Sequence, residues 1–159
     1  MLKLRVSWIK CASIVLIIVA GCGQSRISEQ SDAIVIEVID GDTLDLSIGG
    51  HRQRVRLIGV DTPETKHPRK PIQCFGPEAA AYTKSILAKG TKVRLERDSE
   101  ARDVYDRLLV YLFRDLDNLF INLELVRLGF AHVFTIAPNL AYLDKFVAAS
   151  RDAQSSNLG

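Results

Sequence analysis

Three aspartates, a glutamate and an arginine gather near the ends of two successive apolar segments. Asp40 and Asp42 follow the first segment, Arg56 lies in a later one, and Asp61 and Glu64 come directly after it. Carboxylates that converge without enough basic partners repel one another, so a hard divalent cation such as calcium or magnesium would stabilise the cluster. An arginine beside such an ion suits a phosphate, because its planar fork matches phosphate oxygens. Together these residue types indicate metal-assisted phosphodiester chemistry.

The same residues also allow a simpler interpretation. Residues 40–43 and 61–63 are rich in Asp, Gly, Thr and Pro, which are common turn formers, and Arg56 could be a surface charge on a strand. Two further observations favour a site over turns. Arg107 begins another apolar stretch, and Glu64 follows Asp61 by three residues behind a rigid proline. We therefore predict a catalytic site built from these segments.

The order and spacing of these motifs resemble those of the staphylococcal nuclease family. The resemblance covers about residues 34–146 and rests on residues 38–43, 56–68, 76–79 and 125–131. A continuous run such as Val60-Asp61-Thr62-Pro63-Glu64-Thr65 is far more specific than single matching residues. The resemblance implies an OB-fold barrel and a calcium-dependent phosphodiesterase, acting as an endonuclease or exonuclease, that cleaves DNA and RNA to 3′-phosphate ends.

Metal-ligand roles carry over position by position to the matching residues. Asp42 and Asp61 would bind calcium directly, together with the backbone carbonyl of Thr62. Asp40 would lie nearby or act through a water molecule. Oxygen ligands of this mixed kind are those that calcium accepts.

Catalytic and substrate-binding roles carry over in the same way. Glu64 would orient or deprotonate the attacking water. Arg56 and Arg107 would hold the phosphate and offset the extra negative charge of its transition state. Tyr105 and Phe134 would contact the substrate, Phe134 more weakly.

Two segments depart from the family pattern. Asp106 stands between Tyr105 and Arg107, where the family usually has a glycine, so it adds a negative charge and restricts that turn. Residues 133–139 are one residue shorter than the family segment and lack its paired tyrosines. Phe134 retains part of a stacking surface, while the hydroxyl contacts are missing.

The beginning of the chain has the layout of a secretory signal. Lys3, Arg5 and Lys10 precede the apolar run 14–19, which is too short to span a bilayer comfortably. Val19-Ala20-Gly21-Cys22 resembles the bacterial lipoprotein box, which implies cleavage before Cys22 and attachment of lipid to it. The alternative is an ordinary N-terminal helix with an incidental cysteine.

This segment sets the predicted domain boundaries. We predict a lipoprotein signal peptide at 1–21, a flexible tether at 22–32, and one nuclease domain at 33–159. The protein would be exported as a monomer and anchored by lipid to the bacterial membrane, facing the periplasm or the exterior. Cys74 would be the remaining cysteine of the mature domain, and we expect a buried, inert thiol there.

The charge of the chain does not indicate a general nucleic-acid-binding surface. The whole chain has 21 basic and 19 acidic residues, and three of the basic residues lie in the predicted leader. Without those three, 18 basic residues stand against 19 acidic ones. Affinity for nucleic acid must therefore come from a local groove and the metal.

Apolar alternation and turn residues predict an α+β fold. Strands are expected at 33–39, 43–48, 52–60, 92–97 and 108–113, with Ile34, Ile36 and Val38 on one face of the first and a tight turn at Gly49-Gly50. Helices are expected at 79–88, from Asn118 to Gly129, and at about 140–154. Five short strands with helices favour a small closed sheet, which agrees with a five-stranded OB-fold barrel carrying about three packed helices.

Two functional classes remain. The first is the calcium-dependent nuclease at the cell envelope, and the second is a catalytically weak or inactive OB-fold lipoprotein that binds nucleic acid or a protein. The joint presence of Arg56, Glu64 and Arg107 with the acidic ligands favours the enzyme, because a binding module needs neither a metal site nor a general base.

Overall fold

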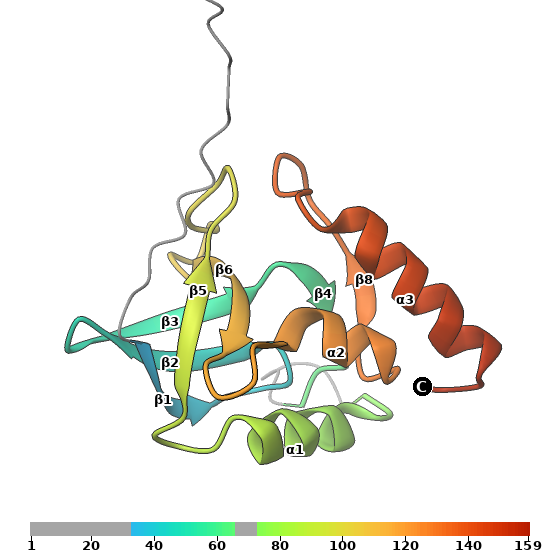
Figure 1. Cartoon of the computed structure of the whole chain (residues 1–159), viewed down its shortest axis with the longest axis horizontal. Coiled ribbons are helices and arrows are strands. Elements are labelled where there is room, and N and C mark those ends of the chain that lie inside the picture. Colours follow the sequence, from blue (N-terminus) through green and yellow to red (C-terminus); the bar gives the residue numbers. More distant parts are fainter. Residues whose placement is uncertain (1–32, 66–72) are drawn as a thin grey trace, which may run out of the picture.

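The computed structural model describes residues 33–65 and 73–159, in which three α-helices pack around a small β-barrel (Figure 1). The predicted signal peptide, the tether with Cys22 and the basic run 66–70 lie outside the described residues. In the part that is described, no helix has the length and apolar character needed to cross a membrane.

Five strands form the barrel. β1 (Ala33–Val38), β2 (Thr43–Ile48) and β3 (His51–Leu57) pair in antiparallel fashion, and β1 continues the sheet to β5 (Lys92–Glu96) and β6 (Leu108–Arg114). β6 then pairs in parallel with β3, so that Val55 lies opposite Leu108 and the sheet closes. The predicted five-stranded barrel in an α+β fold is therefore confirmed.

The hairpin between β2 and β3 follows the predicted register. Gly49 and Gly50 have φ angles of 56° and 82°, the left-handed conformation that a two-residue hairpin turn requires. Buried apolar side chains alternate on both strands, which places Leu44, Leu46, Val55 and Leu57 in the core.

The predicted apolar face of β1 is wrong in its first half. Val35 is buried and Ile34 is 38% exposed, whereas Val38 is buried as expected. The register against β2 shifts between Val35 and Glu37, which marks a β-bulge. Because an extra residue moves the following side chains to the other face, strict alternation does not hold across the bulge.

The predicted strand 52–60 is broken after Leu57. The N–H of Ile58 donates to the carbonyl of Val110, and Gly59 has a φ of 81°. β4 (Gly59–Asp61) then leaves the barrel and pairs with β8 (His132–Phe134) in a separate two-stranded sheet. A Cβ atom at Gly59 would lie 2.3 Å from the ring of Phe146, so the break needs a glycine for both conformation and space.

The three helices begin and end near their predicted bounds, with one clear correction. α1 (Gly76–Ile86) has Pro77 in its first turn, and α3 (Leu143–Ser155) starts three residues later than expected. The second helix, α2 (Ile121–Arg127), does not begin at Asn118. Asn118 has a φ of 56° in the turn that returns β6 to the short strand β7 (Leu119–Phe120), a conformation that asparagine tolerates.

A buried amide fixes the junction between β3 and β4. Asn122 on α2 is fully buried; its Oδ1 accepts from the N–H of Leu112 at 3.0 Å, and its Nδ2 donates to the carbonyls of Ile58 at 2.9 Å and Val110 at 3.2 Å. These bonds give partners to the N–H of Leu112 and the carbonyl of Ile58 where the β3–β6 pairing ends. The segment that follows Arg56 is thereby held against α2.

Cys74 is exposed, so the expectation of a buried thiol is wrong. It lies in the turn before α1, where the N–H of Gly76 donates to the carbonyl of Gln73 and the intervening residues project outward. Phe75 in the same turn has a φ of 69° and is also exposed. Cys74 and Phe75 are therefore exposed although both side chains are apolar.

Candidate active site

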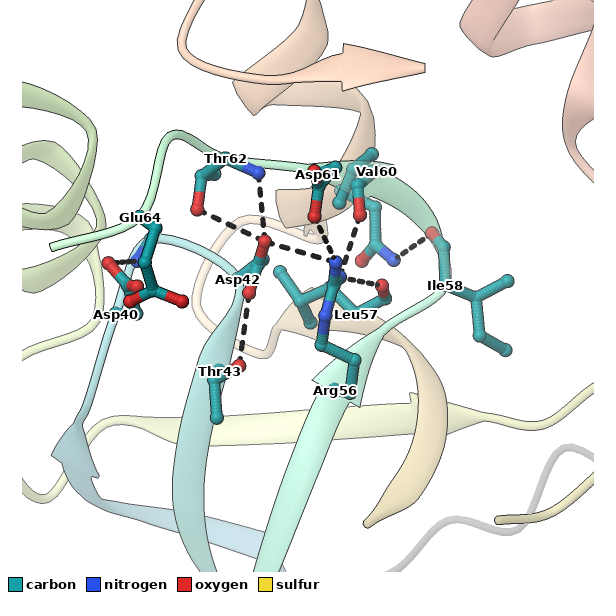
Figure 2. A network of polar contacts seen from close by, with 12 residues as sticks. Asp40, Asp42, Thr43, Arg56, Leu57, Ile58, Val60, Asp61, Thr62 and Glu64 are labelled. Carbon is teal, nitrogen blue, oxygen red and sulfur yellow. Dashed lines mark hydrogen bonds and ion pairs between the residues drawn. The ribbon is translucent and has the colours of Figure 1, made fainter. Parts of the chain in front are cut away.

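Arg56 lies at the centre of a polar network near the end of β3 (Figure 2). Its Nη2 is 2.7 Å from Asp61 Oδ1 and 3.2 Å from Asp42 Oδ2. Its Nη1 donates to the carbonyls of Leu57 at 2.7 Å and Val60 at 2.6 Å. With a side chain only 12% exposed, the guanidinium is held in one place by charge and by the turn that follows β3.

Both carboxylate oxygens of Asp42 accept hydrogen bonds. Its Oδ2 accepts from the N–H of Thr62 at 2.8 Å and from Thr62 Oγ1 at 3.0 Å, and its Oδ1 accepts from Thr43 Oγ1 at 3.0 Å. Gly41 makes the close approach of Thr62 possible, since a Cβ atom there would lie 2.7 Å from the threonine side chain. The turn after β1 and the segment after β4 are thus joined at Asp42.

Asp40 and Glu64 lie together on the other side of Asp42 from Arg56 (Figure 2). Asp40 Oδ1 accepts from the N–H of Gly41 and from Thr65 Oγ1, both at 2.9 Å. Burial, and then the hydrogen bond with the Glu64 carboxyl, raise the pKa of Asp40 above its ordinary value despite those donors. The neighbouring Glu64 carboxyl therefore makes ionisation of Asp40 less favourable.

The donor set of this network suits a hard cation. In residues 33–65 and 73–159 no three acidic, histidine or cysteine side chains are already arranged around one metal position. The carboxylates of Asp42 and Asp61 nevertheless converge on a single cationic nitrogen, Arg56 Nη2. Thr62 follows Asp61 in the sequence and is hydrogen-bonded to Asp42. Hard oxygens that already share one positive charge have the chemistry that calcium requires.

A cavity of about 580 Å³ begins beside this network. Four of the predicted site residues line it: Arg56, Tyr105, Arg107 and Phe134. Tyr105 is 78% exposed and Phe134 is 52% exposed, so both rings are available to a ligand. Arg56 belongs to the cavity wall and to the carboxylate network alike, which joins a cationic, aromatic surface to the acidic cluster.

Arg107 is held apart from the carboxylate network. Its Nε lies 2.7 Å from Asp103 Oδ2, and its guanidinium carbon lies 5.4 Å from the centroid of the Tyr105 ring. The structure thus places Asp42 and Asp61 against Arg56, with Thr62 bonded to Asp42. Asp40 and Glu64 lie beyond Asp42 (Figure 2), and Arg107, Tyr105 and Phe134 lie on the cavity.

The turn at Asp106 has the conformation that a glycine would favour. Asp106 has a φ of 62°, and its N–H donates to the carbonyl of Asp103 at 3.0 Å. Its exposed carboxylate lies 3.4 Å from Arg102 Nη1. The negative charge of Asp106 is therefore paired with Arg102, a third arginine that lines the cavity.

Sequence reasoning missed three residues that support the site. Thr83 on α1 is fully buried and donates to the carbonyl of Gly41 at 2.8 Å. Asn139 is buried and exchanges two hydrogen bonds with the backbone of Glu100, which joins the segments that carry Tyr105 and Phe134. Asp103 bonds Arg107. Of the three, Asp103 alone had a signal, an acid four residues before an arginine in a turn-rich segment.

Comparisons with known proteins agree with this geometry. The staphylococcal nuclease homologue family matches residues 54–159. A thermonuclease of Staphylococcus hyicus is 41% identical over 132 residues, which cover 83% of this chain and 76% of that protein. A thermonuclease of Staphylococcus intermedius is 42% identical over 125 residues, covering 79% and 73%. Endonuclease YncB of Bacillus subtilis is 37% identical over 122 residues, covering 76% and 56%.

These relatives confirm the prediction of a nuclease hydrolase at the level of the enzyme class. The match spans β3 to the end of α3, and the longer alignments reach further toward the N-terminus. The chain belongs to the staphylococcal nuclease family.

Proposed function

We propose that this protein is a calcium-dependent phosphodiesterase of the cell envelope, which hydrolyses DNA and RNA and leaves 3′-phosphate ends. The observation that carries the proposal is the position of Arg56. It pairs with Asp42 and Asp61 and also lines the cavity that contains Arg107. A phosphate held by both arginines would lie next to the acidic cluster.

Asp42, Asp61 and the carbonyl of Thr62 are the groups that would hold calcium, with Asp40 close by. When bound, the ion would supply positive charge against the extra negative charge of the transition state. Arg56 would also supply positive charge to the transition state. It would do so from a fixed position, because its hydrogen bonds to the carbonyls of Leu57 and Val60 already orient it.

Glu64 is the proposed general base. Its carboxyl group lies beside that of Asp40, and its N–H donates to Gln73 Oε1 at 2.8 Å, which fixes the loop after β4. A carboxylate beside the oxygens that would hold the metal can accept a proton from an attacking water.

The cavity supports a nucleic-acid substrate with unpaired bases. Exposed Tyr105 and Phe134 offer flat surfaces for stacking, and Arg107 lies beside Tyr105. Stacking on aromatic rings tolerates every base, so the cavity surface suits single strands of varied sequence.

Location at the envelope is a proposal from the sequence. Cleavage before Cys22 and lipid attachment there would anchor a monomeric domain through the segment 22–32. Cys22→Ser tests this in cells. We expect the variant to leave the membrane fraction, and an unchanged membrane fraction would contradict lipid anchoring.

The first experiment is cleavage of single-stranded DNA by the purified protein, with added calcium or with chelator, followed by mapping of fragment ends. We expect cleavage only with calcium, with 3′-phosphate ends. No cleavage by protein shown to be folded by circular dichroism would contradict the enzyme and favour the OB-fold binding module. In that case measured affinities for DNA and for calcium would replace the turnover assay.

A further inference from the structure

Asp103 closes the turn that carries Tyr105 and Arg107. Its Oδ1 accepts from the N–H of Tyr105 at 3.0 Å and from the N–H of Arg107 at 2.9 Å. Its Oδ2 accepts from Arg107 Nε at 2.7 Å. The N–H of Asp103 in turn donates to the carbonyl of Arg107 at 3.1 Å. One carboxylate therefore fixes both the backbone of the turn and the side chain of its arginine.

We propose that Asp103 is a positioning residue of the nuclease site, which fixes the direction of the Arg107 guanidinium toward a phosphate in the cavity. This inference rests on the proposed function. Asp103, Tyr105 and Arg107 all line the same cavity.

Asp103 can orient Arg107 because it binds the Nε atom of the guanidinium group. Among the described residues, the ion pair of Arg107 uses Nε, the nitrogen nearest the backbone. The two terminal nitrogens then form an edge with a fixed direction, and a guanidinium edge matches two oxygens of a phosphate. An arginine oriented in advance loses less conformational freedom when the substrate binds.

The turn is itself fixed to the strand that carries the other catalytic arginine. Arg102 Nη1 donates to the carbonyl of Asp106 at 2.6 Å, and Arg102 Nη2 donates to Gln53 Oε1 on β3 at 2.9 Å. Arg56 lies three residues further along β3. The turn that carries Arg107 and the strand that carries Arg56 are therefore joined through Arg102.

The protonation state of Asp103 agrees with this role. Burial alone would raise the pKa of Asp103, but the hydrogen bonds from the N–H and guanidinium of Arg107 and from the N–H of Tyr105 bring it below its ordinary value. The carboxylate is thus charged at neutral pH, where the ion pair is needed.

Asp103→Asn separates the two tasks of the carboxylate. The amide oxygen can still accept from the N–H groups of Tyr105 and Arg107, whereas the amide nitrogen would face Arg107 Nε donor to donor. The matched control is Asp117→Asn, because Asp117 Oδ2 pairs with Arg114 Nη2 at 2.6 Å on a turn whose residues do not line the cavity. Asp103→Ser, which keeps a short acceptor without charge, replaces Asp103→Asn if that variant does not fold.

A double-mutant cycle with Arg107→Ala tests the inference, with kcat and KM measured on a single-stranded oligonucleotide. We expect Asp103→Asn to lower kcat/KM about 10-fold in the wild-type background and less than about 2-fold beside Arg107→Ala. Asp117→Asn should leave kcat/KM unchanged. An equal loss in both backgrounds would mean a purely structural role and would overturn the proposal, as would no loss in either.

The same cycle separates this inference from the proposed function. If the wild-type protein does not cleave the oligonucleotide, the proposed function fails, and the cycle is run on oligonucleotide affinity by fluorescence anisotropy. Coupling between Asp103 and Arg107 in affinity would then support positioning for phosphate binding. Additive losses in affinity would overturn it.

Discussion

The hydroxyl group of Thr83, in the buried face of α1, donates a 2.8 Å hydrogen bond to the carbonyl of Gly41 in the turn between β1 and β2. This bond joins a helix outside the barrel to the turn that carries Asp40 and Asp42. Gly41 in turn lies against Thr62, which is bonded to Asp42. The helix therefore supports the acidic network through Gly41.

Replacement of Thr83 by valine should destabilise the fold and the site together. The change keeps the shape of the side chain and leaves the Gly41 carbonyl without its donor, which costs about 1–3 kcal/mol. We expect a lower free energy of unfolding in urea and a reduced kcat. Ser85→Ala on the exposed side of α1 is the control, with an expected change within about 0.5 kcal/mol. Equal stability of Thr83→Val and wild type would contradict the support role.

Replacement of Glu64 by glutamine or alanine should lower kcat by about 100- to 10,000-fold. The reason is that neither side chain can accept a proton from water. The arginines proposed to bind phosphate are untouched, so oligonucleotide affinity should change little. Turnover and affinity are measured on the same single-stranded oligonucleotide. Glu78→Gln in the exposed first turn of α1 serves as the control. Turnover equal to that of the wild type would exclude Glu64 as the base.

Asp45 should contribute to acid sensitivity of the fold. Hydrogen bonds from Arg54, opposed by burial and aided by Arg52, lower its pKa below the ordinary 3.8. A lowered pKa in the folded state stabilises the protein above pH 3.8 and loses that contribution as the pH falls through the folded value. Urea unfolding from pH 5 to pH 2 should therefore show a steeper loss of stability for wild type than for Asp45→Asn. Parallel curves would show that the carboxylate is not the cause.

At pH 7 the same Asp45→Asn variant should already be less stable. The side chain is only 2% exposed and bonds Arg54 Nε at 2.9 Å, so a neutral amide leaves two arginines without their buried anion. We expect a loss of about 1–3 kcal/mol in the free energy of unfolding. A gain in stability would mean that burial of the charge costs more than its pairing returns.

Replacement of Asp106 by glycine should stabilise the turn by up to about 1 kcal/mol, because a left-handed φ of 62° strains a residue that has a side chain. The lost contact with Arg102 is exposed and contributes little. Thermal unfolding measures the change. Asn157→Gly, at a φ of 54° after α3 and away from the cavity, is the matched control and should shift in the same direction. A clear loss of stability in Asp106→Gly would show that the turn depends on the aspartate.

Local patterns predicted the local parts of the fold. The alternation of Leu44, Leu46, Val55 and Leu57 is a property of neighbouring residues, and the Gly49-Gly50 turn fixes the hairpin between them. The acidic residues near Arg56 were predicted to lie together because they follow the ends of successive strands in the sequence. That prediction used only the order of strands and turns along the chain.

The parts that were missed depend on contacts between distant segments. The bulge of β1 depends on its pairing with β2. The break at Gly59 depends on Phe146 and Asn122, which lie on helices much later in the chain. The helix expected to start at Asn118 starts later, because Leu119 and Phe120 pair with β6 as strand β7. Propensity is a weak guide wherever tertiary packing competes with it.

The parallel pairing of β3 with β6 joins parts of the site that lie far apart in the sequence. The hairpins of β1, β2 and β3 pair nearby residues, whereas α1 and β5 lie between Val55 and its partner Leu108 along the chain. Contacts between distant residues form slowly, because chain entropy must be lost before they stabilise the fold. We therefore expect Arg107, next to that pairing, to reach its place beside β3 late in folding, and a nascent chain with only its first three strands to lack a complete site.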